Sequence, residues 1–264
     1  MSFNNLDYMP PSRIERLYSV WYRHFKVYTK NIFSNGFPPF MEPLIFLAGM
    51  GLGLGGYIAE VDNMSYIEYL GIGLPLSSAM FTAAFECTFG TFIRLEFSKT
   101  YDGMLTSPLS IEDLFIGEII WAGTKGAFYS FAVLIVLLAC DVIPVSVSVI
   151  FIPVIGFIVG VMFAPLSLIF MSFVKTINSL NFFITGLITP MFMFSGIIFP
   201  VTNLPKWIQY IIELFPLVHA VNLERALCSN NYSSRLIWDL LYCIIFTLIA
   251  TYISIRRIRK RLMK

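Results

Sequence analysis

Charged residues are scarce in this chain: Asp, Glu, Lys and Arg make up 13% of its 264 residues, against 57% hydrophobic residues. One soluble core of this length cannot enclose so much apolar surface, which excludes an ordinary water-soluble domain. The net charge of +2 is small and the basic residues gather toward the termini, so nucleic acid is not an expected partner. The composition predicts a multi-pass membrane protein.

Residues that build metal sites, disulfides and nucleotide-binding loops are also few. The four cysteines have no paired spacing and His24 and His219 are isolated, so we predict no disulfide framework and no metal site. A phosphate-binding loop ends in Gly-Lys-Ser/Thr, and the chain has no Gly-Lys pair. We therefore expect no catalytic residue and no cofactor on this chain. If its activity is driven by ATP, the ATPase that binds ATP and Mg²⁺ is another polypeptide.

Long apolar runs, in contrast, are abundant. Six runs of about 20 predominantly apolar residues could each cross a hydrocarbon core of roughly 30 Å, which predicts an all-α fold with six transmembrane helices. The runs cover residues 40–58, 67–93, 114–139, 147–174, 180–199 and 236–255. Prolines inside them should kink or locally unwind the helices, because proline lacks an amide proton; they are Pro75, Pro153, Pro165 and Pro190.

Lysine and arginine are distributed unevenly around these spans. Five precede the first span, two follow the second, one follows the fourth and six follow the sixth, whereas the opposite side carries only three. By the positive-inside rule, both termini and the loop around Lys99 are cytoplasmic, and the segment 200–235 is external.

An amphipathic helix is predicted before the first span, within residues 12–34. Ser12 with Glu15 three residues later forms a capping-box pattern. We interpret the helix as lying in the cytoplasmic membrane interface, either as a plain anchor or as a contact for a partner. Its apolar residues recur at helical spacing: Ile14, Leu17, Tyr18, Trp21, Phe25 and Tyr28.

Glycines in the first span are spaced four apart, at Gly49 and Gly53 and at Gly51 and Gly55. Small residues at this spacing let membrane helices approach closely, so we expect packing against another span or a second subunit. Gly156 and Gly160 repeat the spacing in the fourth span. The dinucleotide fingerprint that this glycine run contains is rejected, because no strand precedes it.

Three charged residues lie within spans, where each costs at least roughly 2.5 to 3.5 kcal/mol. Glu86 and Lys125 lie at comparable depth in spans two and three, and Glu118, seven residues before Lys125, shares its helix face. Either they face a pathway for polar headgroups, or an ion pair locks the two spans together. We favour the ion pair, because isolated charges in a membrane usually find each other.

The cytoplasmic segment 94–113 is short and mixed in charge, with a turn at residues 101–103 and a break at residues 106–108. A short helix packed crosswise against a partner would suit it, with Met104 and Leu105 as the apolar contact. A solvated connector is the alternative, and loop length alone does not separate the two.

The segment 189–220 is too apolar for a solvated loop, yet Pro200, Pro205 and Pro216 forbid one continuous helix. They divide it into a span, a turn and two short amphipathic pieces. Backbone that dips into a membrane is tolerated only where it packs on protein or lines a wet cavity, which favours a transport fold. We predict an external re-entrant helix pair over 200–227 that acts as an outer gate and includes Trp207 and His219.

Several stretches together resemble the permease subunits of ABC-2 type exporters, especially the nodulation protein J group. The resemblance covers nearly the whole chain. Its marks are PPFMEPLIFLAGMGLGLG at 38–55, FECTFGTFIR at 85–94, YDGMLTSPLS at 101–110, GEIIWAGTKG at 117–126, and TPMFMFSGIIFP, LP and FPLVHA within 189–220.

What this resemblance implies is a half-transporter of the bacterial inner membrane: an interface helix over 1–37, a six-span domain over 38–264 with a basic tail at 256–264, a homodimer, and two copies of a cytosolic ABC ATPase. The stretch 99–110 would be the coupling helix seated in the ATPase. The residues expected there are Lys99, Thr100, Tyr101, Asp102, Gly103, Met104, Leu105 and Thr106.

The implied activity is transport without covalent chemistry on this chain. Relatives export lipo-oligosaccharides, lipid-linked polysaccharides or drugs, so we expect ATP-driven export of an amphipathic glycan or glycolipid. A multidrug or lipid exporter is the nearer alternative, and a non-conducting membrane scaffold that recruits an ATPase is the more distant one. The abundant Phe and Tyr do not decide between them, since aromatic residues are common in membrane proteins.

Overall fold

The computed structural model describes residues 11–55, 57–58, 60–61, 64–143, 148–229 and 233–263. The first ten residues of the predicted interface region, Gly56 of the first predicted span, and Val147, where the fourth was predicted to begin, lie outside these ranges. Within them the fold is helical, and the only extended pairing is a single bridge between Val61 and Met64. The prediction of an all-α membrane protein is confirmed.

Among the described residues, four helices are long and apolar enough to cross a membrane. They correspond to the second, third, fourth and sixth predicted spans. They are Tyr66–Phe97, α7 (Ile111–Ala139), Ser148–Phe173 and α13 (Arg235–Leu262). The first begins as α5 (Tyr66–Phe85) and contains π-helical turns at Glu86–Gly90 and Ile93–Phe97. The third contains α8 (Ile152–Phe173). The sixth continues as a helix beyond residue 255, through most of the basic tail.

Helices also occupy the places of the first and fifth predicted spans. Residues 38–55 form α3 (Pro38–Phe46), a π-helix (Leu47–Leu52) and α4 (Gly53–Gly55). The helix Ile177–Met193 contains α9 (Leu180–Phe183), a π-helix (Ile184–Ile188) and α10 (Thr189–Met193), and extends about 25 Å. Its predicted end at Phe199 was wrong, because the chain turns at Gly196, whose φ of 84° suits a residue without a Cβ.

The prolines differ in their effects. Pro75 and Pro165 lie inside α5 and α8, as predicted. Pro190 follows the π-helical turn Ile184–Ile188, which is a local departure from α geometry. Pro153 was expected to kink its span, but it stands in the first turn of α8, where no intrahelical donor is required.

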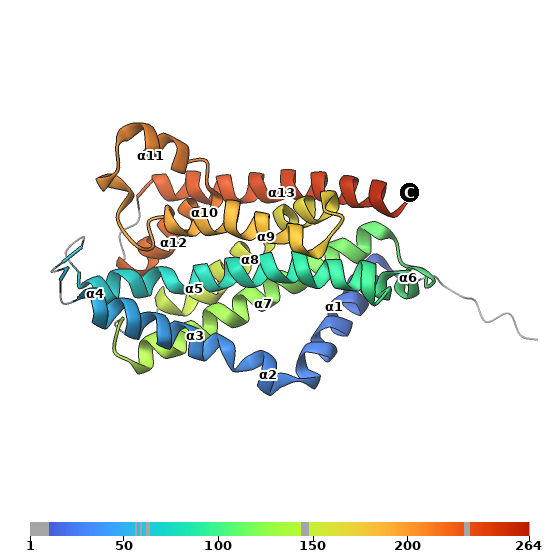
Figure 1. The fold of residues 1–264 in the computed structure, drawn as a ribbon, viewed down its shortest axis with the longest axis horizontal. Helices are drawn as coiled ribbons and strands as arrows, with labels where there is room; N and C mark the ends of the chain where they lie inside the picture. Colours follow the sequence, from blue (N-terminus) through green and yellow to red (C-terminus); the bar gives the residue numbers. More distant parts are fainter. Residues whose placement is uncertain are drawn as a thin grey trace, which may run out of the picture.

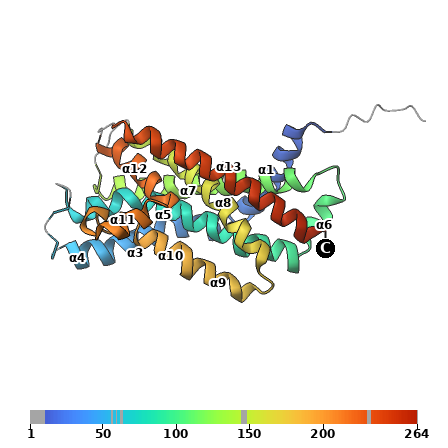
Figure 2. The same ribbon diagram turned by 90° about the horizontal axis from the view of Figure 1, so that it is seen from above.

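The predicted amphipathic helix is α1 (Arg13–Lys30), and Ser12 and Glu15 form its capping box. A short helix, α2 (Ile32–Gly36), joins it to α3. α1 leaves the bundle at an angle (Figure 2) and packs on α7 through Val20, which is seated on Gly117. Much of the predicted apolar stripe stays at the surface, with Ile14 79% exposed. The exposed stripe is compatible with a membrane boundary.

Glycines bring α7 and α8 into backbone contact. A Cβ built on Gly126 would lie 2.7 Å from the Gly156 carbonyl oxygen, and one on Gly160 would lie 2.7 Å from the Ala122 carbonyl oxygen. The predicted packing role of Gly156 and Gly160 is therefore confirmed. In the first glycine run, Gly51 and Gly55 face Ile67 of α5, whereas a Cβ on Gly49 or Gly53 would meet nothing within 4 Å among the described residues.

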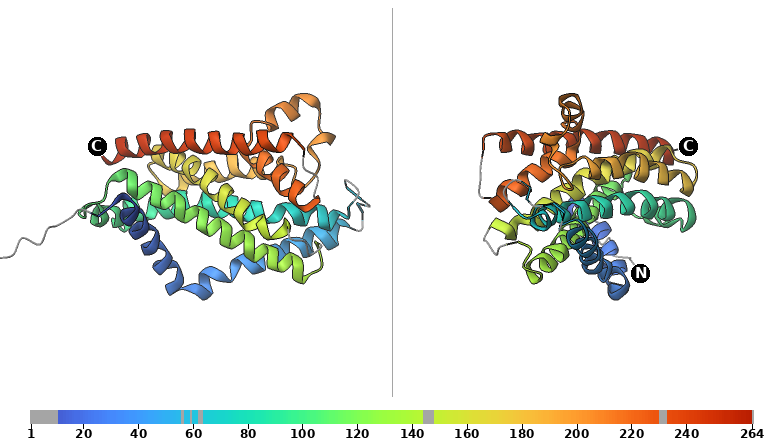
Figure 3. Two further views of the ribbon diagram at one scale, coloured as in Figure 1. Left: turned by 180° about the vertical axis from the view of Figure 1, so that it is seen from behind. Right: turned by 60° about the vertical axis from the view of Figure 1, so that its left-hand side comes forward.

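The bundle is elongated and its two ends differ (Figure 1). One end carries α6 (Thr100–Leu105) and the C-terminal turns of α13; we call it the α6 end. The other, the α11 end, carries α4, α11 (Lys206–Ile212) and α12 (Pro216–Ser229). The views in Figure 3 show the same separation. The basic residues of α13 thus lie at the α6 end, opposite the predicted gate segment.

Candidate functional site

A row of alternating charges lies inside the protein where the Tyr66–Phe97 helix meets α7. Lys125 Nζ lies 2.8 Å from Glu86 Oε2. Arg94 bridges two carboxylates, with Nη1 2.8 Å from Glu86 Oε1 and Nη2 2.7 Å from Glu118 Oε2. The predicted ion pair between spans two and three is present, and Glu118 is connected to it through Arg94. Two positive and two negative side chains balance one another.

Two further residues bring α6 and α1 into this charge cluster. Tyr101 of α6 donates its hydroxyl to Glu118 Oε1 over 2.6 Å and accepts a hydrogen bond from Arg94 Nε over 3.0 Å. Burial raises the pKa of the Tyr101 hydroxyl well above its ordinary value, so it stays a neutral donor. His24 Nε2 of α1 lies 2.9 Å from the same Glu118 oxygen, out of line for a hydrogen bond. Glu118 is fully buried.

The cluster holds three residues that could ligate a metal, one histidine and two glutamates, so we tested it as a metal site. One ligand atom from each of His24, Glu86 and Glu118 lies within 4.8 Å of the others. However, Arg94 and Lys125 already contact the carboxylate oxygens and neutralise them. A metal ion would have to displace both cations, so the residues fit an ion-pair network and not a metal centre.

The cluster connects four elements through its contacts: α1, the Tyr66–Phe97 helix, α6 and α7. A second contact reinforces it, because Arg16 Nε of α1 lies 2.7 Å from Asp113 Oδ2 at the start of α7. Removing one partner of a buried ion pair typically costs about 3–5 kcal/mol, so these contacts resist separation. The cluster therefore links α6 directly to the membrane helices.

Three members of the cluster differ from what the sequence predicted. Arg94 was counted as a loop charge, but its side chain is only 16% exposed. Tyr101 was expected to contact an ATPase, but it points inward and is buried. His24, interpreted as isolated, stacks on Trp121 with ring centroids 5.8 Å apart. For Arg94 a signal existed: it follows Glu86 by about two helical turns.

The other predicted coupling residues lie on or near the surface. The exposed ones are Lys99, Asp102, Gly103 and Thr106, and the partly buried ones are Thr100, Met104 and Leu105. Lys99 has a left-handed backbone with φ of 50°, and it directs the chain out of the Tyr66–Phe97 helix into α6. The predicted short helix is therefore present, with one side turned to the cluster and the other open.

A cavity of about 360 Å³ opens beside Lys125. Its lining combines aromatic, hydroxyl and charged side chains: Pro38, Glu42, Ser78, Phe81, Thr82, Phe85, Lys125 and Tyr129. Phe81 also packs edge-on against Phe192, with ring centroids 5.6 Å apart. Lys125 is thus both an ion-pair partner and a cavity-lining residue, so the two interpretations made from the sequence are compatible.

At the α11 end, prolines begin the predicted short helices. Pro205 precedes α11 and Pro216 is the first residue of α12, while Pro200 precedes a single 3₁₀ turn, Val201–Asn203. Trp207 on α11 is 65% exposed. The segment therefore has the predicted division into two short helices.

His219 at this end is a connecting residue. Its Nδ1 lies 2.6 Å from Asp239 Oδ1 of α13, and its Nε2 lies 2.9 Å from the Glu213 carbonyl oxygen after α11. His219 therefore ties α12 to α13 and to the turn between α11 and α12. Neither partner could be inferred from the sequence, since Asp239 is 20 residues away along the chain.

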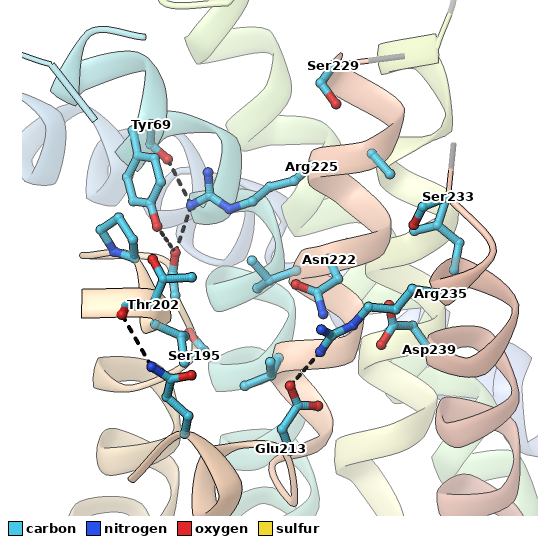
Figure 4. A pocket seen from close by; sticks show the side chains of 18 residues that line it. Tyr69, Ser195, Thr202, Glu213, Asn222, Arg225, Ser229, Ser233, Arg235 and Asp239 are labelled. Carbon is cyan, nitrogen blue, oxygen red and sulfur yellow. Dashed lines mark hydrogen bonds and ion pairs between the residues drawn. The ribbon is translucent and has the colours of Figure 1, made fainter. Parts of the chain in front are cut away.

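A polar cavity of about 420 Å³ lies beneath α11 and α12 (Figure 4). Arg225 donates to the Gly196 carbonyl oxygen over 2.7 Å, and its guanidinium lies 3.7 Å from the centre of the Tyr69 ring. On another wall Arg235 Nη2 lies 2.5 Å from Glu213 Oε1. The volume falls within the usual range of small-molecule sites, and the predicted gate segment forms much of the lining.

Three features define a polytopic membrane protein of the transport class. The helices have the length of a membrane, and cavities lined by polar and aromatic side chains lie at two places along the bundle. A charge network also reaches the surface helix α6. The chain belongs to the ABC-2 type transporter family, which matches residues 15–228. The match runs from α1 through most of α12 and includes the charge cluster.

Relatives within this family are similar over almost the full length. Nodulation protein J of Neorhizobium galegae is 30% identical over 252 residues, 96% of each chain. Nodulation protein J of Rhizobium leguminosarum bv. trifolii is 29% identical over 264 residues, 100% of each chain. The inner membrane transport permease YadH of Escherichia coli (strain K12) is 21% identical over 207 residues, 78% of this chain and 80% of that one. The resemblance seen in the motifs is confirmed: the chain is a nodulation protein J-like permease, a transport subunit whose family implies an ABC ATPase partner.

Proposed function

We propose that this chain is the permease of an ATP-driven exporter that moves an amphipathic glycan or glycolipid outward across the bacterial inner membrane. The observation that carries the proposal is full-length similarity to proteins named nodulation protein J, together with the lipo-oligosaccharide export that the resemblance implies. The cavity beside Lys125 supports a cargo with polar and apolar parts, because its walls combine phenyl rings with hydroxyl and charged groups.

The proposed arrangement has six spans, with residues 38–55 as the first and Ile177–Met193 as the fifth. The α6 end faces the cytosol, which is supported by the basic residues gathered there. Two copies form the transporter with two ATPase subunits. Gly49 and Gly53 support a second copy or another close partner at the first span, because nothing in the described chain covers them within 4 Å.

In the proposed mechanism, the ATPase contacts the open side of α6, including Asp102 and Thr106. ATP-driven movement of α6 pulls on Tyr101, which holds Glu118, and the charge cluster carries the movement into the Tyr66–Phe97 helix and α7. At the other end, α11 and α12 act as the outer gate. They would open toward the exterior when the bundle rearranges.

The test is reconstitution of the purified chain with its ABC ATPase in proteoliposomes. We expect ATP-dependent transfer of a fluorescent lipid-linked oligosaccharide, and cargo-stimulated hydrolysis. An ATPase unable to hydrolyse ATP is the control. Stimulation by drugs and not by the oligosaccharide would favour a multidrug exporter. ATPase binding without any transfer would favour the scaffold alternative, and ion current without ATP would refute the proposal.

A further inference from the structure

A basic cavity of about 590 Å³ lies between the C-terminal ends of α8 and α13, at the α6 end. Four cationic side chains and one carboxylate line it, so its charge is strongly positive. The lining residues are Glu96, Ser172, Phe173, Val174, Lys175, Arg257, Lys260 and Arg261. It is separate from the charge cluster and from the cavity beneath α11 and α12, with which it shares no lining residue.

One cation in this cavity, Arg261, already has partners within the protein. Arg261 Nη2 lies 2.9 Å from Glu96 Oε1, and its Nη1 donates to the Met171 carbonyl oxygen near the end of α8. Arg261 therefore neutralises the only carboxylate of the lining and supplies a donor to a carbonyl group at a helix end.

The other three cations, Lys175, Arg257 and Lys260, are exposed and have no ion-pair partner among the described carboxylates. Arg257 is held over the Phe173 ring, with its guanidinium carbon 4.7 Å from the ring centre. Three uncompensated positive charges thus converge on one hollow, and like charges so placed repel one another unless an anion lies between them.

Apolar surface adjoins the cavity directly. Phe173 is 59% exposed at its edge, and Ile253 and Ile249, one and two turns before Arg257 along α13, are exposed as well. In a spanning helix such residues face lipid acyl chains. A ligand with an anionic head and a hydrocarbon tail would place the head among the cations and the tail along α13. A small soluble anion would contact only the cations and not the apolar surface along α13.

We propose that this cavity binds the phosphate of an anionic phospholipid, with the acyl chains lying along α13. Basic pockets between membrane helices bind such headgroups, and each lysine or arginine near an anionic membrane surface contributes enough attraction to change affinity by about fivefold. The site holds a resident lipid next to the end of α8. It does not depend on the proposed cargo, since neither ATP nor an ATPase takes part in binding.

The experiment is native mass spectrometry of the purified full chain titrated with phosphatidylglycerol, with zwitterionic phosphatidylcholine, and with inorganic phosphate as a competitor. We expect Arg257→Gln to weaken phosphatidylglycerol binding about fivefold, and the triple variant Lys175→Gln/Arg257→Gln/Lys260→Gln to weaken it about a hundredfold. Arg257→Lys keeps the charge and should bind within about twofold of the unaltered chain.

Arg256→Gln is the matched control, because Arg256 is the neighbouring exposed arginine on α13 and lines a different cavity, beside Glu112. It should leave the affinity unchanged. The proposal is overturned if the triple variant binds phosphatidylglycerol as well as the unaltered chain, if Arg256→Gln weakens binding as much as Arg257→Gln, or if phosphatidylcholine binds equally. Displacement of the lipid by an equal concentration of inorganic phosphate would show that acyl chains contribute nothing, and would also overturn it. Because the measurement uses no ATPase, its failure would leave the export proposal standing.

Discussion

Replacement of Arg94 by methionine tests the charge cluster most directly. The substitution keeps a long side chain but removes the cation that joins Glu86 to Glu118. Glu86 would keep Lys125, and the buried Glu118 would keep the Tyr101 hydroxyl. Breaking a buried ion pair costs about 3–5 kcal/mol, and since each carboxylate retains one partner we expect the lower value, about 3 kcal/mol. That loss lowers the folded-to-unfolded ratio more than a hundredfold.

The measurement is the free energy of unfolding by SDS titration in mixed micelles, followed by tryptophan fluorescence. Arg94→Lys keeps the charge but cannot hold two carboxylates in a fork, so we expect a smaller loss, about 1–2 kcal/mol. Adding Glu118→Gln to Arg94→Met should recover part of the loss, because no uncompensated carboxylate then remains at that position. The control is Arg256→Met, an exposed arginine whose replacement should stay within about 0.5 kcal/mol.

A loss below about 1 kcal/mol for Arg94→Met, or no recovery in the double variant, would refute the reasoning. The first result would mean that the cluster is hydrated and its charges are screened. The second would mean that the damage comes from lost packing by the arginine stem and not from an unpaired charge.

Three further predictions concern Tyr101, Gly160 and Glu224. Tyr101→Phe removes a donor to a buried carboxylate; it should cost about 1–2 kcal/mol of unfolding free energy and speed hydrogen exchange in α6, and unchanged exchange would count against the coupling role. Gly160→Leu should prevent α7 and α8 from packing, so no monodisperse protein should be recovered by size-exclusion chromatography. Gly186→Leu should purify normally, because a Cβ there meets nothing within 4 Å among the described residues.

The third of these concerns Glu224, a buried residue of α12 whose two carboxylate oxygens have no hydrogen-bond partner among the described residues. Burial raises its pKa well above the ordinary value, so the folded chain keeps a proton that the unfolded chain releases above about pH 4.3. The free energy of unfolding should therefore fall as pH rises from about 4.3 toward the folded pKa, and Glu224→Gln should flatten this dependence. Equal slopes for both proteins between pH 5 and pH 8 would contradict the prediction.

Local chemistry along the chain was sufficient for the membrane class and the four longest helices, and the resemblance of its motifs was sufficient for the family. Apolar runs of bilayer length can be recognised from the sequence alone, and so can helix starts such as Ser12 with Glu15 and Pro216. The division of 189–220 into short helices followed equally from its prolines, because Pro200, Pro205 and Pro216 stand close together and each removes a backbone donor. A single proline is tolerated in a long membrane helix, as Pro75 and Pro165 show. In the fifth predicted span the end was wrong, because a turn at Gly196 follows the helix inside an apolar run.

The tertiary structure alone decided which side chains meet. Arg94, Tyr101 and His24 read from the sequence as a loop charge, a surface contact and an isolated histidine, yet all three converge on Glu118. Helical spacing determines which residues share a face of one helix, whereas the rotation and depth of one helix against another depend on packing over the whole bundle. The Glu86 to Lys125 pair could be predicted because both charges lie in spans. The parts of Tyr101 and His24 could not, because α6 and α1 acquire their positions only when the bundle is assembled.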